Sequence, residues 1–411
     1  MLTDHFNALG MKVAERWARY NFDTEAFPNI AFEEISEARS WEVVPAAEIV
    51  TWVTTAALLP LQPNLDSTFG EPPLTLFWHP RFFIEVLLWT TATPDVHQHG
   101  FSGAFAIWEG SSIQCRFTFV RERRINSAMW LGRLNIGDVQ LLQKGSVQRI
   151  EAGPRFIHST FHLTRPSVTL LVRTHADAEH RPQLSYFQPC LAIDPLNKDP
   201  LLTRQLQVLS FLDTIRSSLF ENAACSAVRH ADLYGSFCIL RHLRSVPRAS
   251  HVFTACVEVA GARHGDDVAR LVEVIDELDR LSRIRSLRVA IGRSDLRLYL
   301  ALLMNVPSYD PIIQVIRELY PKEDAIELVT RWSSEIFGAN SCGIEFDEQN
   351  KRIFRALLRT RSADAAFADL ATESNQTASG TDTDDCRRRL REIQSCAVFR
   401  PLFRPSLGVG L

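Results

Sequence analysis

The fold is decided by two stretches, residues 93–110 (TPDVHQHGFSGAFAIWEG) and residues 153–162 (GPRFIHSTFH). Successive side chains of a β-strand point to opposite faces, so His97 and His99 share one face, with their Cα atoms about 7 Å apart. His158, Thr160 and His162 share a face of the second stretch in the same way. Two imidazoles on one strand and a third on a later strand predict a β-barrel that holds a borderline metal ion.

Short apolar runs separated by glycine-containing turns surround both stretches, which is typical of β-strands. Strands of this length and spacing predict a jelly-roll barrel. The predicted strands are Phe82–Thr90, His97–Trp108, Ile113–Val120, Ala128–Asn135, Val139–Gln143, Ser146–Ile150, Phe156–Leu163 and Val168–Thr174.

Helical periodicity dominates the rest of the chain. It predicts helices over 3–20 and 46–59 before the barrel, and over 201–220, 266–284, 310–320, 324–337 and 349–361 after it. The predicted fold class is α+β. Its parts are a helical N-terminal segment packed on the barrel (1–72), a β-barrel metal domain (73–195), an α-helical domain (196–372) and a flexible tail (373–411).

Composition narrows the classes of function. The net charge of −3 over 411 residues gives no reason to expect nucleic acid as a partner. The most apolar run, residues 49–61, is shorter than the roughly 20 residues that span a bilayer, so no membrane is expected. The eight cysteines form no C-x-x-C pair and the first residues show no signal-peptide pattern, so a cytoplasmic protein with reduced thiols is expected.

The histidine stretches resemble the two motifs of the cupin superfamily, G-x5-H-x-H-x3,4-E-x6-G and G-x5-P-x-G-x2-H-x3-N. His97, His99 and Gly110 fall in register with the first motif, and Gly103 stands where the family has a glutamate ligand. His158 takes the histidine place of the second motif and His162 the final asparagine place. The resemblance covers about residues 75–190 and implies a cupin-type barrel (double-stranded β-helix).

A set of three histidines without the glutamate looks most like the thiol dioxygenases, the cysteine dioxygenase group. Residues 86–89 and 97–103 are also similar to their "LxxW … HDHxxSxG" run. The strand after the second motif departs from that group, because Leu171 and Arg173 stand where its histidine and tyrosine assist thiol oxidation. Cysteine itself is therefore not the expected substrate.

The metal ligands predicted are His97, His99 and His158. Imidazole ligands suit Fe, Zn, Ni and Cu alike, and the resemblance favours Fe(II). A carboxylate from Asp95 or Glu85 remains an alternative third ligand. Each of these histidines would otherwise be a hydrogen-bonded polar residue of the barrel interior.

His162 and Arg173 are the candidate catalytic residues, His162 as a base facing the substrate. The candidate substrate-binding residues are Arg116, Gln114, Phe101 and Tyr186. An arginine inside the barrel would bind a carboxylate bidentately. The alternatives are that His162 and Phe101 belong to the core and that either arginine faces solvent.

The leading hypothesis is a mononuclear non-haem Fe(II) cupin oxygenase that oxidises a small, anionic or sulfur- or nitrogen-containing metabolite with O2. One alternative is a non-catalytic metal- or ligand-binding sensor or scaffold whose helical domain binds a partner protein. The other is a metal-dependent isomerase or lyase that needs no O2. A homodimer, or a protein partner bound through the helical domain, is the assembly to consider.

Overall fold

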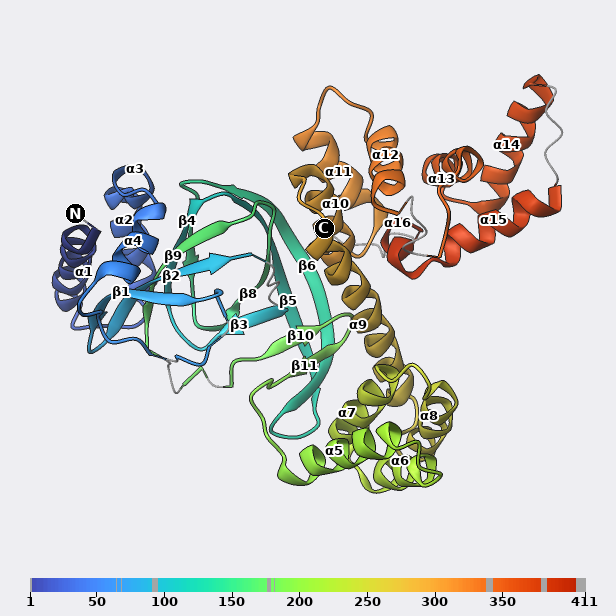
Figure 1. Ribbon diagram of the computed structural model, residues 1–411, viewed down its shortest axis with the longest axis horizontal. Helices are drawn as coiled ribbons and strands as arrows, with labels where there is room; N and C mark the ends of the chain where they lie inside the picture. Colours follow the sequence, from blue (N-terminus) through green and yellow to red (C-terminus); the bar gives the residue numbers. More distant parts are fainter. Residues whose placement is uncertain are drawn as a thin grey trace. The chain divides into compact units, whose positions relative to one another are not determined.

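The structure is a computed structural model that describes residues 2–63, 65–67, 69–90, 95–175, 179–180, 182–337, 343–377 and 383–403. The chain divides into two compact units, Met1–Asp279 and Arg280–Leu411, and the division falls inside helix α9 (Asp267–Ala290). The first unit combines helices with all of the described strands, whereas the described part of the second unit is helical (Figure 1).

Six strands of the first unit close into a barrel in the order β10-β11-β6-β5-β8-β3. Their pairs are antiparallel, and the long hairpin of β5 and β6 forms one wall. The bounds are β3 (Val96–His99), β5 (Ser111–Arg124), β6 (Met129–Gln143), β8 (Gly153–His162), β10 (Ser185–Phe187) and β11 (Leu191–Ile193). The prediction of a mixed α+β fold with a β-barrel is confirmed at this level.

A second, five-stranded antiparallel sheet has the order β1-β2-β9-β4-β7. Its strands are β1 (Pro73–His79), β2 (Phe82–Trp89), β4 (Gly103–Glu109), β7 (Val147–Ile150) and β9 (Ser167–Thr174). Alternate residues serve two cores, so that Leu87 and Phe105 meet the interior of the barrel whereas Val86 and Ala106 meet the N-terminal helices. Burial on both faces explains why β2, β4 and β9 read as nearly continuous apolar runs.

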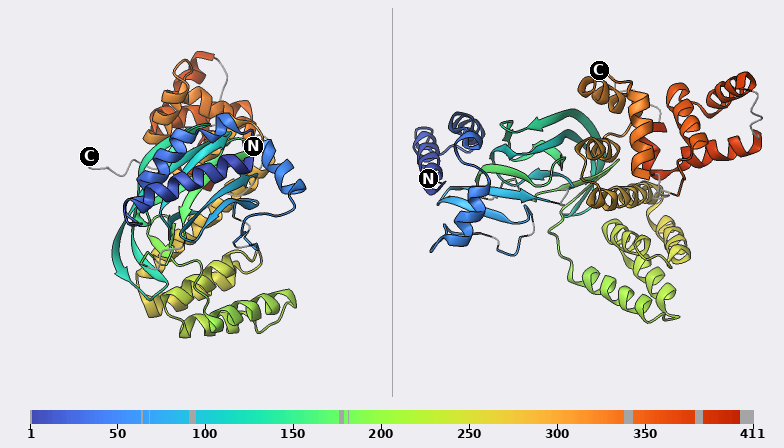
Figure 2. Two further views of the ribbon diagram at one scale, coloured as in Figure 1. Left: turned by 90° about the vertical axis from the view of Figure 1, so that its left-hand side faces the viewer. Right: turned by 45° about the horizontal axis from the view of Figure 1, so that its top comes forward.

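The N-terminal helices cover the outer face of this five-stranded sheet (Figure 2). They are α1 (Leu2–Ala18), α2 (Phe27–Ala38), α3 (Ser40–Val43) and α4 (Ala47–Thr55). The apolar residues of α1 recur every three to four positions, and Phe6, Val13 and Trp17 are buried. Trp108 of β4 also donates its indole N–H to the carbonyl of Val44 at 2.9 Å. The segment is thereby part of the same core as the sheet.

Five further helices follow the barrel: α5 (Pro200–Thr214), α6 (Phe220–His230), α7 (Leu233–Arg244), α8 (Ser250–His264) and α9. They share one apolar core with barrel residues such as Met129, Leu131 and Leu191. The predicted domain boundaries at 72/73 and 195/196 therefore lie within the first unit, and no observation tests them as boundaries of independently folding parts.

The described part of the second unit consists of helices around a core that includes Trp332, Phe354 and Phe399. These helices are α10 (Ser294–Asn305), α11 (Tyr309–Leu319), α12 (Ala325–Phe337), α13 (Glu348–Thr360), α14 (Ala363–Thr377), α15 (Thr383–Ser395), the 3-10 helix η1 (Ala397–Phe399) and α16 (Arg400–Phe403).

The strand boundaries differ from the predicted ones in three places. The predicted strand His97–Trp108 breaks at residues 100–102, so that β3 joins the barrel and β4 joins the five-stranded sheet. Residues 128–143 were predicted as two strands, but Met129–Gln143 forms the single strand β6. Strand β5 stays paired with β6 along this length through shifts of register. Strands β1, β10 and β11 were not predicted.

Residues 383–403 lie in the stretch that was predicted as a flexible tail. They form α15, η1 and α16, and Cys386, Leu390 and Ile393 of α15 are buried at helical spacing. Arg389 pairs with Asp385 on its own helix and with Asp347, which ties α15 to the start of α13. The predicted tail also includes residues 378–382 and 404–411, which lie outside the described residues.

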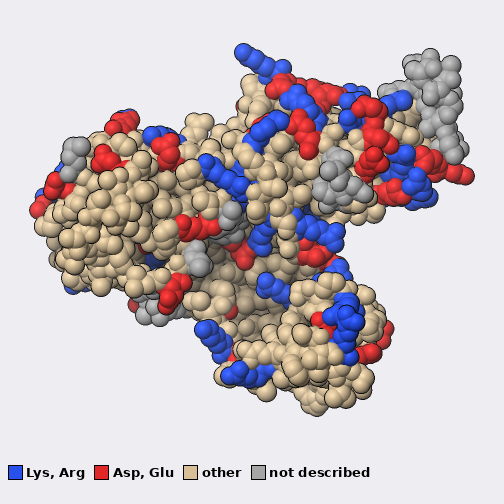
Figure 3. Space-filling model, viewed as in Figure 1, with Lys and Arg blue, Asp and Glu red and all other residues tan. Residues whose placement is uncertain are grey.

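No helix in the described part of the chain is long and apolar enough to cross a membrane. On the face drawn in Figure 3, positive and negative side chains are interspersed over the helical parts of both units, and the surface around the barrel carries fewer charges.

Candidate metal centre

The two stretches that decide the fold become β3 and β8, which are hydrogen-bonded neighbours in the barrel. His97 lies opposite His158, whereas His99 lies opposite Gly153, because the register shifts between the two histidines of β3. Such irregularities redirect side chains within a sheet. Gly153 has a φ of 75°, a left-handed conformation that glycine adopts readily, so the local sequence permits the shift.

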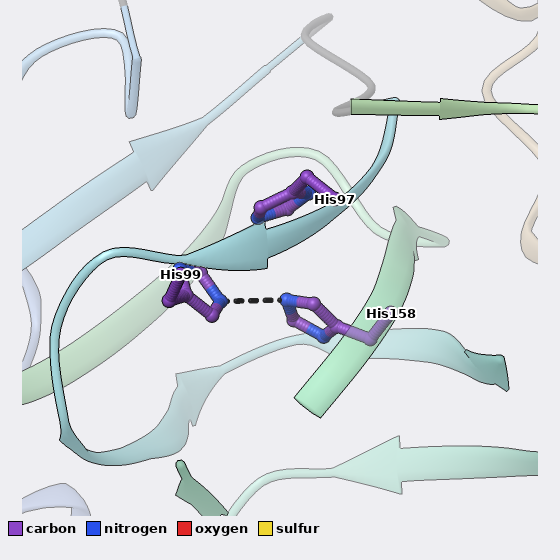
Figure 4. A group of neighbouring side chains, drawn as sticks. All are labelled: His97, His99 and His158. Atoms are coloured by element: carbon purple, nitrogen blue, oxygen red, sulfur yellow. Dashed lines mark hydrogen bonds between the residues drawn. The ribbon is translucent and has the colours of Figure 1, made fainter. Parts of the chain in front are cut away.

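The imidazole rings of His97, His99 and His158 converge inside the barrel (Figure 4). Their centroids are 4.7 Å apart for His97 and His99, 4.8 Å for His97 and His158, and 5.0 Å for His99 and His158. One ligand nitrogen from each residue lies within 4.8 Å of the others, and all three residues are buried. The expectation of a buried group of three histidines in a barrel is therefore confirmed.

Hydrogen bonds orient two of the three rings with their Nε2 atoms available. The Nδ1–H of His97 donates to the backbone carbonyl of Asp95 at 2.8 Å. The Nδ1–H of His158 donates to the side-chain oxygen of Gln114 at 3.2 Å. A neutral imidazole that carries its proton on Nδ1 presents a lone pair on Nε2, which is how outer contacts commonly orient histidine ligands.

The nitrogen positions fit a metal ion. Nε2 of His97 is buried and has no hydrogen-bond partner, an arrangement that costs free energy unless another group occupies the space beside it. Nε2 of His99 and Nε2 of His158 lie 2.9 Å apart. Two nitrogens that each lie about 2.0–2.1 Å from one ion, at an angle of roughly 90° to each other, have this separation.

Burial also keeps the rings neutral, as metal ligands must be. Desolvation lowers the pKa of His97 and lowers the pKa values of His99 and His158 well below the ordinary value. The positive charge that a neighbouring histidine would carry lowers the pKa values of His99 and His158 further. At neutral pH all three rings can therefore bind a cation without first losing a proton.

A cavity of about 60 Å³ lies against the three imidazoles. Its wall is mostly apolar and comes from both the barrel and the five-stranded sheet. The lining residues are Phe69, Leu87, Trp89, His97, His99, Phe101, Phe105, Ile150, His158, Thr160, His162, Thr169, Leu171 and Arg173. An ion held by the three histidines would thus face a small space with a mostly apolar wall.

His162 lines the same cavity as the three histidines. Its ring stacks on the indole of Trp89, with centroids 4.5 Å apart and planes 20° apart. Its Nδ1 is 2.8 Å from the hydroxyl oxygen of Ser112. The ring is thus fixed on one face and at one nitrogen, beside the space where a substrate of the centre would lie.

Arg173 also reaches the cavity, but its charge is already paired. Its Nη1 lies 3.5 Å from a carboxylate oxygen of Glu85, and both side chains are largely buried. Its guanidinium carbon is 3.5 Å from the ring centroid of Phe101 and 5.0 Å from that of Phe83. Burial raises the pKa of Glu85 and lowers the pKa of Arg173, and the ion pair opposes both shifts.

The predicted substrate-binding residues lie in different surroundings. Phe101 lines the cavity, whereas Gln114 faces His158 from the outside of the centre. Arg116 does not line the cavity; it stacks on Phe156 at 3.9 Å and donates to the backbone carbonyl of residue 155. Tyr186 lies on the other face of the sheet from His97, and its hydroxyl donates to Gln98 at 2.5 Å. The role of each in binding a substrate stays a prediction.

The structure also gives a reason for the missing carboxylate. A Cβ atom at Gly103 would lie 2.1 Å from the carbonyl oxygen of Val172 on the neighbouring strand. Glutamate therefore cannot replace this glycine without moving β4 away from β9. Of the two carboxylate alternatives, Glu85 pairs with Arg173, and among the described residues neither Glu85 nor Asp95 belongs to the group of side chains that could hold a metal ion.

Sequence reasoning missed the partners that hold these side chains: the Asp95 carbonyl, Ser112 beside His162, and Glu85 beside Arg173. Alternation along a strand identifies residues that share a face, but these partners lie on other strands or follow from backbone geometry. Only the register of β5 on β8, which sets Ser112 opposite His162, reveals such a pair. Neither a known family model nor a curated protein was found to match this sequence.

Proposed function

We propose that this protein is a mononuclear non-haem Fe(II) oxygenase that oxidises a small metabolite with O2. The observation that carries the proposal is the buried, unpartnered Nε2 of His97 beside the Nε2 atoms of His99 and His158. A hydrogen-bonded histidine cluster with no further role would satisfy this nitrogen. The resemblance to the three-histidine cupins favours iron over the other metals that imidazole binds.

Three protein ligands leave positions open on an ion, which distinguishes a catalytic site from a closed structural site. Iron in this set would supply the electron transfer that the reaction of O2 with an organic molecule requires. The protein's own part is to hold the substrate beside the centre and to exclude water. The apolar wall, with Trp89, Phe101 and Phe105, supports both tasks.

His162 is the residue we assign to proton transfer. It lines the cavity, and the Ser112 hydroxyl and the Trp89 ring fix its orientation. Either neutral tautomer suits the role, because the serine hydroxyl can donate to Nδ1 or accept from it. A histidine held in this way can take a proton from a substrate or return one.

The proposal is tested by purifying the full chain under anaerobic conditions and measuring its metal content and its O2 uptake with a panel of small metabolites. We expect a single equivalent of iron per chain and O2 uptake that depends on one of the metabolites. The substitution His97→Ala should abolish both. The matched control is His251→Ala, because His251 lies exposed on α8, away from the centre.

Three results would contradict the proposal. Unchanged metal content in His97→Ala would reject the ligand assignment. Zinc, or no metal, in the active preparation would reject the iron enzyme and favour a sensor or scaffold. Turnover of a metabolite without O2 would favour an isomerase or lyase.

A further inference from the structure

The described wall of the cavity contains a single cationic side chain besides its histidines, that of Arg173. A substrate with a carboxylate group would need this guanidinium, because an arginine fork is the natural partner of a carboxylate inside a protein. The contacts of Arg173 therefore decide which substrates the cavity accepts.

Two of the three guanidinium nitrogens of Arg173 already face a partner, and two aromatic rings lie beside the group. Nη1 faces Glu85 at 3.5 Å, and Nε donates to the backbone carbonyl of Thr174 at 3.3 Å. The aromatic rings of Phe101 and Phe83 lie within 5.0 Å of its central carbon. Glu85 is 7 % exposed, so a carboxylate that approached the guanidinium would either meet a buried negative charge or displace it from Nη1 and leave it unpaired.

Strand register explains why Glu85 is committed to this contact. On β2, Glu85 pairs with Leu171 of β9, and its neighbour Phe83 pairs with Arg173, so all four side chains lie on the face toward the barrel. Alternation places Glu85 one step along the same face from Arg173. The pair is a built feature of the sheet rather than a surface contact that solvent would screen.

Besides the histidines, Thr160 offers a polar side chain to a substrate in the described part of the cavity. Thr160 lies between His158 and His162 on the same face of β8, lines the cavity and is 9 % exposed. Within the described chain no side-chain hydrogen bond is made by its hydroxyl. The hydroxyl can donate to or accept from a polar atom of a substrate.

The volume limits the size of the substrate. The cavity measures about 60 Å³, well below the roughly 300–1,000 Å³ of pockets that hold drug-sized ligands. An ion at the three histidines would itself attract one ionised or polar atom of the substrate.

We propose that the cavity accepts a small substrate without a carboxylate for Arg173, and that Glu85 sets this selectivity by holding Arg173. Thr160 would then supply the hydrogen bond that orients the substrate's polar atom. This inference deepens the proposed oxygenase function and rests on it in one respect, namely that the bound molecule is a substrate. The selectivity itself depends on the cavity alone.

The test compares acetate with acetamide, which has the same shape without the charge. Binding to the full chain is measured by ligand-observed NMR, once as purified and once after removal of metal with a chelator. In Glu85→Gln we expect the affinity for acetate to rise about tenfold over the wild-type value, because the guanidinium of Arg173 then no longer faces a negative charge. The affinity for acetamide should change less than about twofold.

Two further variants locate the effect. Adding Arg173→Met to Glu85→Gln should remove the gain in acetate affinity. Glu109→Gln makes the same chemical change at an exposed position of β4 and should leave both affinities at wild-type values. An unchanged acetate affinity in a Glu85→Gln variant with a native circular-dichroism spectrum would overturn the proposal.

The wild-type protein provides a test that does not depend on how the variants fold. Metal-free wild type should bind acetate no better than acetamide. A preference for acetate of about tenfold or more that disappears in Arg173→Met would show that Arg173 is available to carboxylates, and would refute the role of Glu85. These measurements need neither iron nor O2, so their failure is distinguishable from failure of the oxygenase proposal.

Discussion

The hydrogen bond made by Nδ1 of a histidine determines whether Nε2 of the same ring presents a lone pair to a metal ion. In His158 this contact is the side-chain oxygen of Gln114, which is fully buried. The amide of Gln114 in turn lies 3.5 Å from Gln148, so its oxygen is directed to the imidazole and its nitrogen to a second amide. Gln114 thus contacts the candidate metal centre through Nδ1 of His158.

We therefore expect Gln114→Met to weaken metal binding without removing a ligand. Loss of an outer contact of this kind lowers metal affinity by about 10–100-fold. Competition with a chromophoric chelator measures the affinity for Co(II) or Zn(II). The control is Gln140→Met, because Gln140 pairs with Gln114 across the β5–β6 ladder but is exposed. Equal affinities in the two variants would contradict the role assigned to Gln114.

The features of the centre that depend on alternation along a single strand could be predicted from the sequence. Alternation on β3 and β8 predicts that His97 and His99 share a face and that His162 faces the same side as His158. Alternation alone does not predict that Glu85 holds Arg173, since this contact needs the register of β2 on β9. Cross-strand register depends on packing of the whole sheet, which local sequence does not reveal.

At the scale of elements, the chain passes from the barrel to the five-stranded sheet between β3 and β4. The sequence predicts one continuous strand there because apolar and polar residues continue without a proline, yet Gly100, Ser102 and Gly103 interrupt it. Gly103 is needed at the start of β4, where its backbone lies close to that of β9. The break places the two histidines in the barrel and directs Phe105 into the cavity wall from the opposite sheet.

A methyl group at this position tests the argument. Gly103→Ala should destabilise the first unit by about 1–3 kcal/mol or more, because Cβ would overlap the Val172 carbonyl oxygen and force β4 away from β9. Urea denaturation followed by tryptophan fluorescence measures the loss. Gly137→Ala on β6 is the matched control, since its nearest neighbouring atom would be at an ordinary 3.5 Å. Equal stability of the two variants would mean that β4 and β9 tolerate the extra atom.

At the scale of the whole molecule, burial of three neutral imidazoles links stability to pH. Their pKa values are lowered in the folded protein, so between the folded and unfolded values the unfolded chain binds more protons. Stability of the metal-free protein is therefore fully present above a pH of about 6.5 and is lost as the pH falls from there toward the folded-state values. Each such histidine contributes a slope of up to about 1.4 kcal/mol per pH unit.

The prediction is that the urea midpoint of the metal-free protein falls between pH 7.5 and pH 5.5, and that His97→Asn makes this fall shallower by removing one of the three groups. A shallower slope is expected even if the substitution also lowers stability at both pH values, because the slope reports protons taken up on unfolding rather than packing. His251→Asn, at an exposed position, should keep the wild-type slope. If His97→Asn and His251→Asn show the same slope, the imidazole of residue 97 is not held neutral by burial, and the reason for expecting a cation beside it is lost.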